Sequence, residues 1–129
     1  MELRQLTPDD RPALSMLMGA AFDGGRRPGP VIAGKPPGPD DVKPSVTWGL
    51  FDGARLVASA TVHDLHVTWG DHDAPMGGIA GVACVADQRG RGHVARLLGQ
   101  SLSGMQDAGQ YLSGLYPFAY AFYRRYGWE

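Results

Sequence analysis

The spacing of hydrophobic and polar residues predicts a strand, a helix, three antiparallel strands, a second helix, a further strand and a short final helix. Residues 2–6 alternate as a short first strand. Thr7 is placed as an N-cap and Pro8 stands at the first helical position. The next helix has a buried stripe of Leu14, Leu17, Met18, Ala21 and Phe22, and the Gly24-Gly25 pair is expected to end it.

Three strands are predicted in the middle of the chain. Residues 46–51 form one strand, and Asp52-Gly53 is a strong hairpin signal leading into a second strand from Arg55 to Trp69. A turn over residues 70–75 precedes a third strand over 76–85. Because this third strand is apolar on both faces, we expect it inside the sheet.

From about Gly92 the pattern changes to a helix, for which Gly109 is a plausible C-cap. Residues 111–116 form a last strand, and residues 119–126 a short helix ended by Gly127. We predict a mixed α/β domain, an α+β arrangement with a mixed sheet, and a single domain over residues 1–129. One face of the long helix is predicted to comprise Val94, Leu97, Leu98, Ser101, Leu102 and Met105.

The composition excludes several classes of protein and site but does not point to a function. Hydrophobic residues make up 43% and charged residues 19% of the chain, as in a folded protein. The net charge of −1 gives no field that would attract nucleic acid or an anionic membrane. Cys84 is the only cysteine, which excludes an internal disulfide and a cysteine-based zinc cage. With no signal peptide and no long apolar run, we expect a cytoplasmic protein without a membrane segment or a metal.

A glycine-rich turn, Asp87-Gln88-Arg89-Gly90-Arg91-Gly92-His93-Val94, lies between the apolar strand and the long helix. The unpaired N–H groups of such a turn, together with the helix dipole, form a cradle for a pyrophosphate. Arg89 and Arg91 would add charge-assisted contacts. The segment is neither a P-loop nor a dinucleotide fingerprint. Two alternatives stay open: a turn without a ligand, and an arginine–glycine tract that binds nucleic acid.

This turn resembles the [QR]-x-x-G-x-[GA] motif of GNAT N-acetyltransferases, which binds the pyrophosphate of CoA. Arg89 and Gly92 match its first and fourth positions, whereas Val94 stands at the sixth, where the motif has Gly or Ala. The segment PMGGIAGVACVADQRGRGHVARLL is similar to the enhanced-intracellular-survival (Eis)-like branch, which tolerates a bulky aliphatic residue there. Residues 116–129, YPFAYAFYRRYGWE, resemble the FYRRFGWE-type segment of the same branch, although these aromatics could also serve only to pack a helix.

The resemblance implies the GNAT acyl-CoA N-acyltransferase fold, with acetyl-CoA as co-substrate and no metal. It implies that Tyr123 donates a proton to the departing CoA thiolate, and the ordinary tyrosine pKa of roughly 10 suits a proton donor. An N–H of the strand before the turn would polarise the thioester carbonyl. The residues implied in cofactor binding are Val82, Ala83, Cys84, Arg89, Gly90, Arg91, Gly92, His93, Val94, Ala95, Phe118 and Ala119.

The acceptor implied by the resemblance is a primary amine on a small molecule, aminoglycoside-like or polyamine-like. Phe22, Asp64, His66 and Trp69 stand where GNAT enzymes often bind acceptors. His63 and His66 are three residues apart and face opposite sides of a strand, so they do not form a metal pair. Cys84 is interpreted as a core residue rather than a nucleophile, because no activating base stands near it.

GNAT domains continue with two more strands after the position of Glu129, and the Eis-like branch adds further domains that supply the general base. The resemblance therefore implies only the N-terminal, acetyl-CoA-binding part of the fold, incomplete at its C-terminus. The last strand would then have an open edge, which we expect to be covered by a second copy, a swapped element or further domains. An alternative function is a truncated GNAT module that binds acetyl-CoA without turnover. The proline-rich segment, with six of the ten prolines between Pro28 and Pro44, is predicted to be a long loop.

Overall fold

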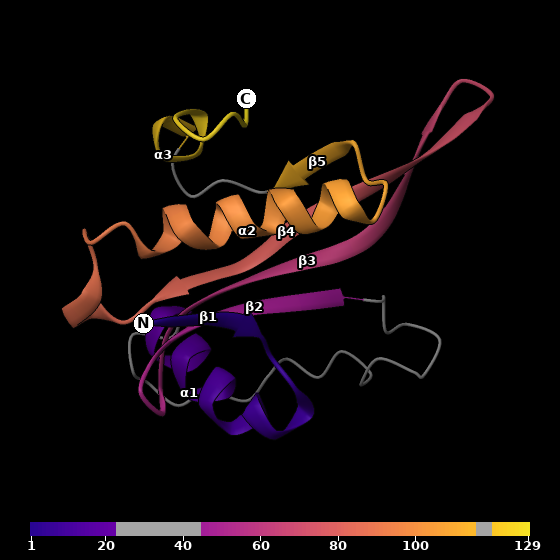
Figure 1. Cartoon of the computed structure of the whole chain (residues 1–129). Helices are drawn as coiled ribbons and strands as arrows, with labels where there is room; N and C mark the ends of the chain where they lie inside the picture. The colour runs from indigo at the N-terminus through magenta and orange to yellow at the C-terminus, as the bar shows by residue number, and fades with distance from the viewer. Residues whose placement is uncertain (23–44, 116–119) are drawn as a thin grey trace, which may run out of the picture.

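The structure, a computed structural model, describes residues 1–22, 45–115 and 120–129 (Figure 1). The order of its elements agrees with the prediction and confirms a mixed α/β domain. The strands are β1 (Glu2–Gln5), β2 (Ser45–Asp52), β3 (Arg55–Trp69), β4 (His72–Cys84) and β5 (Leu112–Leu115). The helices are α1 (Arg11–Phe22), α2 (His93–Asp107) and α3 (Tyr120–Arg124), with 3₁₀ turns at Pro8–Asp10 and Ala86–Gln88.

The strands form one sheet in the order β1-β2-β3-β4-β5. All neighbours are antiparallel except β4 and β5, which are parallel, as expected for strands joined through a helix. Figure 1 shows α1 on one face of the sheet and α2 on the other. As predicted, β4 lies inside the sheet, and β5 is an edge strand among the strands that the structure describes.

Each face of the sheet has its own hydrophobic cluster. Leu17 of α1 packs with Phe51, Leu56 and Ala83 on one face. On the opposite face, Leu97 of α2 packs with buried residues of β2 and β3, namely Leu50, Val57, Ala58 and Ala60. Because β3 contributes to both clusters, its residues from Leu56 to Ala60 are buried without alternation.

The start of the first helix is held by Asp10. Its carboxylate accepts hydrogen bonds from the backbone N–H of Thr7 at 2.8 Å and from two nitrogens of Arg4, each at 2.8 Å. The Arg4 guanidinium, followed by the Thr7 N–H, holds the pKa of the Asp10 carboxyl far below its usual range. The cap predicted at Thr7 therefore leads into a 3₁₀ turn first, and α1 begins at Arg11.

Two hairpins join the antiparallel strands. The turn residues are Gly53-Ala54 and Gly70-Asp71, and both glycines have a φ of 59°. A left-handed first turn residue suits a two-residue hairpin and needs glycine. The turn predicted over residues 70–75 was too long, because Trp69 pairs directly with His72 and β4 begins there.

Helix α2 ends as predicted at Gly109, which has a φ of 73°. The N–H of Gly109 bonds to the carbonyl of Gln106 and that of Gln110 to the carbonyl of Met105, which is a Schellman motif. On the predicted face, Leu97, Leu98, Ser101 and Met105 are buried, whereas Val94 is half-buried and Leu102 is 42% exposed. Leu102 lies about 100° around the helix axis from buried Ser101, at the margin of the apolar stripe.

The other observed helix and strand boundaries differ from the predicted ones by a few residues. β1 ends at Gln5, β5 covers only Leu112–Leu115, and α3 covers only Tyr120–Arg124. The predicted helix end at Gly24-Gly25 and the proline-rich loop lie outside the described residues. No helix in the described part of the chain is long and apolar enough to span a membrane.

Candidate functional site

The turn between β4 and α2 has a backbone that only glycine adopts readily. Gly90 has a φ of 75° and Gly92, the N-cap of α2, has a φ of 79°. No side chain among the described residues caps this helix end. The first N–H groups of α2 therefore point beyond the helix without an intrahelical partner, where the positive end of the helix dipole also lies.

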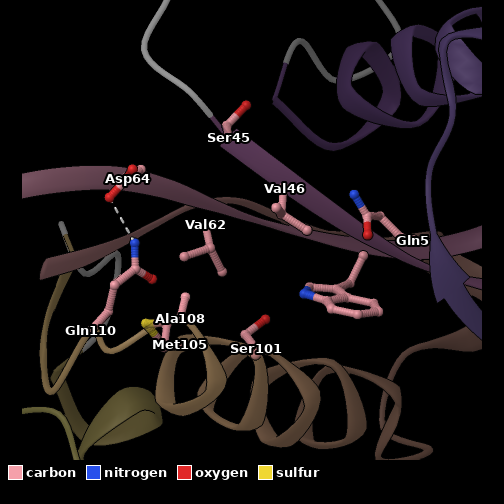
Figure 2. A pocket seen from close by; sticks show the side chains of 11 residues that line it. Gln5, Ser45, Val46, Val62, Asp64, Ser101, Met105, Ala108 and Gln110 are labelled. Carbon is pink, nitrogen blue, oxygen red and sulfur yellow. Dashed lines mark hydrogen bonds between the residues drawn. The ribbon is translucent and has the colours of Figure 1, made fainter. Parts of the chain in front are cut away.

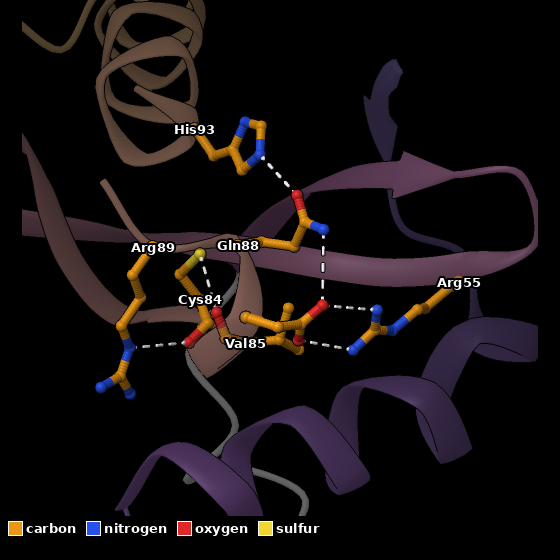
Figure 3. Close-up of polar contacts among 7 residues, drawn as sticks. Arg55, Cys84, Val85, Gln88, Arg89 and His93 are labelled. Atoms are coloured by element: carbon orange, nitrogen blue, oxygen red, sulfur yellow. Dashed lines mark hydrogen bonds and ion pairs between the residues drawn. The ribbon is translucent and has the colours of Figure 1, made fainter. Parts of the chain in front are cut away.

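A chain of polar contacts fixes this turn to the sheet (Figure 3). Arg55 donates to both carboxylate oxygens of Asp87, at 3.0 and 2.8 Å. Gln88 donates to Asp87 through Nε2, and its Oε1 lies 3.4 Å from Nε2 of His93 at the start of α2. The Arg55 guanidinium lowers the pKa of Asp87 to about 2, so this carboxylate is ionised at neutral pH.

Arg89 is anchored at the same turn. Its Nε donates to the carbonyl of Cys84 at 3.3 Å, which brings the arginine back over the end of β4 (Figure 3). The Cys84 thiol lies 3.5 Å from the carbonyl of Val85, and burial raises its pKa. A raised pKa disfavours the thiolate and supports the interpretation that Cys84 is not a nucleophile.

Strand β4 changes its pairing where it approaches the turn. Ser59 pairs with Ala83 and Thr61 with Ala80, so Gly81 and Val82 both stand opposite the single residue between them. This is a β-bulge, with Gly81 at a φ of 58°. The pairing of β4 with β5 ends at Ile79. From Ala80 to Cys84, no strand among the described ones pairs with the second edge of β4.

A cavity of about 760 Å³ opens beside this edge and the N-terminus of α2. It reaches from α2 and α3 on one face of the sheet to the end of α1, since Ala21 lines it as well. Arg89 and Arg125 line the cavity, and no acidic side chain is among its described lining residues, so this part of the lining favours an anionic ligand. The lining residues are Ala21, Val82, Ala83, Cys84, Gln88, Arg89, Gly90, Gly92, His93, Val94, Ala95, Phe122, Arg125 and Tyr126.

The structure brings most of the predicted cofactor residues together around this cavity. Arg91 is the exception among the described ones, because it is exposed and does not line the cavity. Phe118 and Ala119 lie outside the described residues. Five further residues line the cavity that the sequence did not predict for it: Ala21, Gln88, Phe122, Arg125 and Tyr126. The helical spacing of the last three, i, i+3 and i+4, was a usable signal that they share a face.

Tyr123 lies behind the cavity wall rather than on it. Its side chain is 5% exposed and packs in a cluster with Val62, Ile79, Leu98 and Met105. Its ring meets the ring of Phe122 edge-on, with centroids 5.0 Å apart. Burial raises the pKa of the Tyr123 phenol, which keeps the hydroxyl protonated at neutral pH. Its catalytic role stays a prediction.

The structure does not bring the predicted acceptor residues into one site. Val62 packs against α2, and because strand residues alternate, Asp64 and His66 lie on that same face. Trp69 lies on the opposite face and is 74% exposed near the hairpin turn. The side chain of Phe22 lies outside the described part of the structure.

Asp64 and His66 have separate partners. Asp64 accepts a hydrogen bond from Gln110 at 2.9 Å and lines a second, smaller cavity. His66 lies 3.5 Å from Asp73 across the β3–β4 hairpin. In the described ranges, no group of three His, Cys, Asp or Glu side chains is placed to hold a metal ion.

Comparison with known sequences places the chain in a family. The sequence model of the acetyltransferase (GNAT) domain matches residues 2–129. The chain therefore belongs to the acetyltransferase (GNAT) domain family. An uncharacterized N-acetyltransferase of Streptomyces avermitilis is 32% identical over 85 residues, which cover 65% of this chain and 20% of that protein.

Solved structures share the fold. A probable N-acyltransferase from Enterococcus faecalis superimposes with a TM-score of 0.80 at 21% identity, covering 98% of this chain and 31% of that one. A predicted acetyltransferase from Clostridium acetobutylicum, solved with acetyl-CoA, has a TM-score of 0.76 at 16% identity, covering 99% and 89%. Eis1 from Mycobacterium abscessus has a TM-score of 0.74 at 17% identity, covering 98% and 30%.

The similar proteins differ widely in length. This chain spans 20% of the Streptomyces protein and 31% of the Enterococcus chain, but 89% of the Clostridium chain. The expectation of an incomplete GNAT fold therefore stays a prediction. At 17% identity, the likeness to Eis1 shows a common fold, and membership of the Eis-like branch stays a prediction as well.

Proposed function

We propose that this domain binds acetyl-CoA in the larger cavity and transfers its acetyl group to a primary amine of a small molecule. The observation that carries the proposal is the arginine-lined cavity at the uncapped N-terminus of α2. Acetyl-CoA supplies an activated acyl group as a thioester, and its pyrophosphate is the anion that such a helix end accommodates.

The residues of the turn fit a pyrophosphate. A Cβ placed on Gly90 or Gly92 would meet no protein atom within 4 Å, so a ligand can approach this backbone closely. The N–H groups from Gly92 to Ala95 then donate to phosphate oxygens, and Arg89 adds a charge-assisted contact. The contacts of Arg55 and Gln88 hold the turn in this shape before binding, which reduces the entropy lost on binding.

The open edge of β4 suits the extended arm of CoA. Val82, Ala83 and Cys84 line the cavity, and no described strand pairs with this edge. An extended ligand lying there can hydrogen-bond to their backbone as an added strand would. An N–H aimed at the thioester carbonyl would stabilise the charge that develops on its oxygen.

We propose that Tyr123 donates the proton to the departing sulfur, because its raised pKa keeps it protonated at neutral pH. This role requires the hydroxyl to reach a cavity whose wall is formed by the neighbouring Phe122 and Tyr126. The acceptor proposed is an aminoglycoside-like or polyamine-like amine. A general base supplied by further domains and a partner that covers the edge of β5 remain predictions from the resemblance. A cytoplasmic location remains a prediction from the sequence.

A second candidate function is acetyl-CoA binding without turnover. The burial of Tyr123 in the hydrophobic cluster, away from the cavity lining, favours it. In this case the arginines and the glycine turn bind the cofactor, and Tyr123 does not act as the proton donor.

Calorimetric titration with acetyl-CoA, followed by a thiol-release assay against a panel of amines, separates these functions. Binding that Arg89→Ala weakens and Arg11→Ala leaves unchanged would support the cofactor site, because exposed Arg11 lies outside the cavity. Release of CoA that depends on an added amine would establish the enzyme, whereas binding without release would establish the module. No binding by the folded chain would refute both.

A further inference from the structure

A second cavity, of about 290 Å³, lies between the sheet and the C-terminal half of α2 (Figure 2). Gly104 forms one wall opposite the indole ring of Trp48, and a Cβ on it would lie 3.4 Å from that ring, an ordinary van der Waals contact. The lining residues are Gln5, Ser45, Val46, Trp48, Val62, Asp64, Ser101, Gly104, Met105, Ala108 and Gln110.

The cavity has an apolar interior and one charge. Val46, Val62 and Met105 contribute aliphatic and thioether surface, and Trp48 contributes an aromatic ring. Among the described residues that line the cavity, Asp64 is the only one with a formal charge. One of its carboxylate oxygens accepts a hydrogen bond from Gln110 at 2.9 Å, which orients the carboxylate (Figure 2).

This cavity is separate from the proposed acetyl-CoA site. Among the residues that the structure describes, none lines both cavities. Val94 and Gly104, which belong to one cavity each, are ten residues apart on α2, or roughly 15 Å along its axis. The charges are also opposite, with arginines at one cavity and an aspartate at the other. The second cavity is therefore separate from the turn that is proposed to bind the pyrophosphate.

We infer that the second cavity is a non-catalytic binding site for a small organic cation with an aromatic or aliphatic body. The carboxylate of Asp64 pairs with the cationic group, and the body lies against Trp48 and Met105. The carboxylate selects a cation over an anion or a neutral molecule of equal size, and the aromatic ring favours an apolar body. A volume near 300 Å³ suits a molecule of about ten non-hydrogen atoms. The inference does not depend on acetyl transfer.

The test uses phenethylammonium as the probe and the uncharged 2-phenylethanol as its matched analogue. Titration of the isotope-labelled 129-residue chain is followed by NMR, which resolves the indole N–H of each tryptophan and the side-chain amide of Gln110. We expect saturable shifts at Trp48 and Gln110, with Trp69 and Trp128 unaffected, and an affinity for the alcohol at least about fivefold weaker.

Asp64→Asn tests the charge, and Asp71→Asn is its matched control, because it removes the same charge from the same hairpin outside the cavity. We expect Asp64→Asn to raise the dissociation constant for phenethylammonium by about fivefold or more and Asp71→Asn to leave it unchanged. Equal binding of amine and alcohol, equal effects of the two variants, shifts centred on residues 93–95, or no saturable shift would each overturn the inference. Competition between the probe and acetyl-CoA would overturn the independence of the two sites.

Discussion

Arg55, the first residue of β3, and Asp87, in the turn before α2, form a bidentate ion pair with N–O distances of 3.0 and 2.8 Å. The two residues are 32 positions apart in the sequence. Asp87 in turn accepts a hydrogen bond from Gln88, which contacts His93. The ion pair therefore connects the sheet to the glycine turn that borders the proposed acetyl-CoA cavity.

Loss of the ion pair should weaken acetyl-CoA binding without direct loss of a ligand contact. Because both side chains are half exposed, we expect Arg55→Ala to raise the dissociation constant only about two- to fivefold. Calorimetry measures the change, and Arg11→Ala is the control. The exchanged pair Arg55→Asp with Asp87→Arg should regain part of the affinity. A double variant no better than either single variant would contradict this role.

The left-handed glycines of the turn should not tolerate a side chain. Gly90→Ala and Gly92→Ala force a non-glycine residue to a φ of 75° or 79°, which costs about 1–2 kcal/mol each. We expect lower stability in urea and weaker acetyl-CoA binding. Gly99→Ala is the matched control, because Gly99 lies within α2 and has open space around it. This change should raise the free energy of unfolding by about 0.5–1 kcal/mol. Unchanged binding by Gly90→Ala and Gly92→Ala would remove the turn from the cofactor site.

Tyr123→Phe should separate turnover from binding. If Tyr123 donates the proton, the rate of amine-dependent CoA release should fall by about 100-fold or more, while the affinity for acetyl-CoA stays near that of the parent. Tyr126→Phe is the comparison, because Tyr126 lines the cavity directly. A larger loss of turnover in Tyr126→Phe than in Tyr123→Phe would transfer the role to Tyr126.

Acid should weaken the fold partly through Asp87. The pKa of Asp87 is lowered from 3.8 to about 2 by Arg55, so the folded state binds fewer protons than the unfolded state between these values. Its stabilising contribution is therefore present above about pH 4 and is lost as the pH falls toward 2. Urea unfolding at several pH values should show a stability difference between the parent and Asp87→Asn that shrinks over this range. A difference independent of pH would contradict the ion pair.

Alkali should weaken the fold partly through Tyr123. Burial raises the pKa of its phenol, so the folded state retains a proton that the unfolded state has already lost above about pH 10. The stabilising contribution is thus complete below pH 10 and is lost as the pH rises through the folded-state pKa. Ultraviolet titration of the five tyrosines should include one late component, and Tyr123→Phe should remove it. A late component that persists in Tyr123→Phe would belong to another tyrosine.

Local sequence patterns were enough to predict the helices and strands of this fold. Glycines at Gly53, Gly92 and Gly109 marked a hairpin turn, a helix start and a helix end, and each has a positive φ in the structure. These signals work because a left-handed backbone conformation depends on the residue itself. The turn after Trp69 was less well predicted, because one glycine permits a two-residue turn and only strand pairing shows that the turn ends there.

The sequence by itself determined the order of the elements and the mixed α/β class, and it singled out nine residues, predicted to bind the cofactor, that line the larger cavity. The tertiary structure decided what lies across from them: Ala21 from α1, the placement of Tyr123 behind the cavity wall, and the separation of Asp64 from Trp69 onto opposite faces. It also decided the pairing of Arg55 with Asp87 and the second cavity around Asp64. Helix and strand periods follow from neighbouring residues, whereas these relationships depend on packing between segments that are distant in the chain.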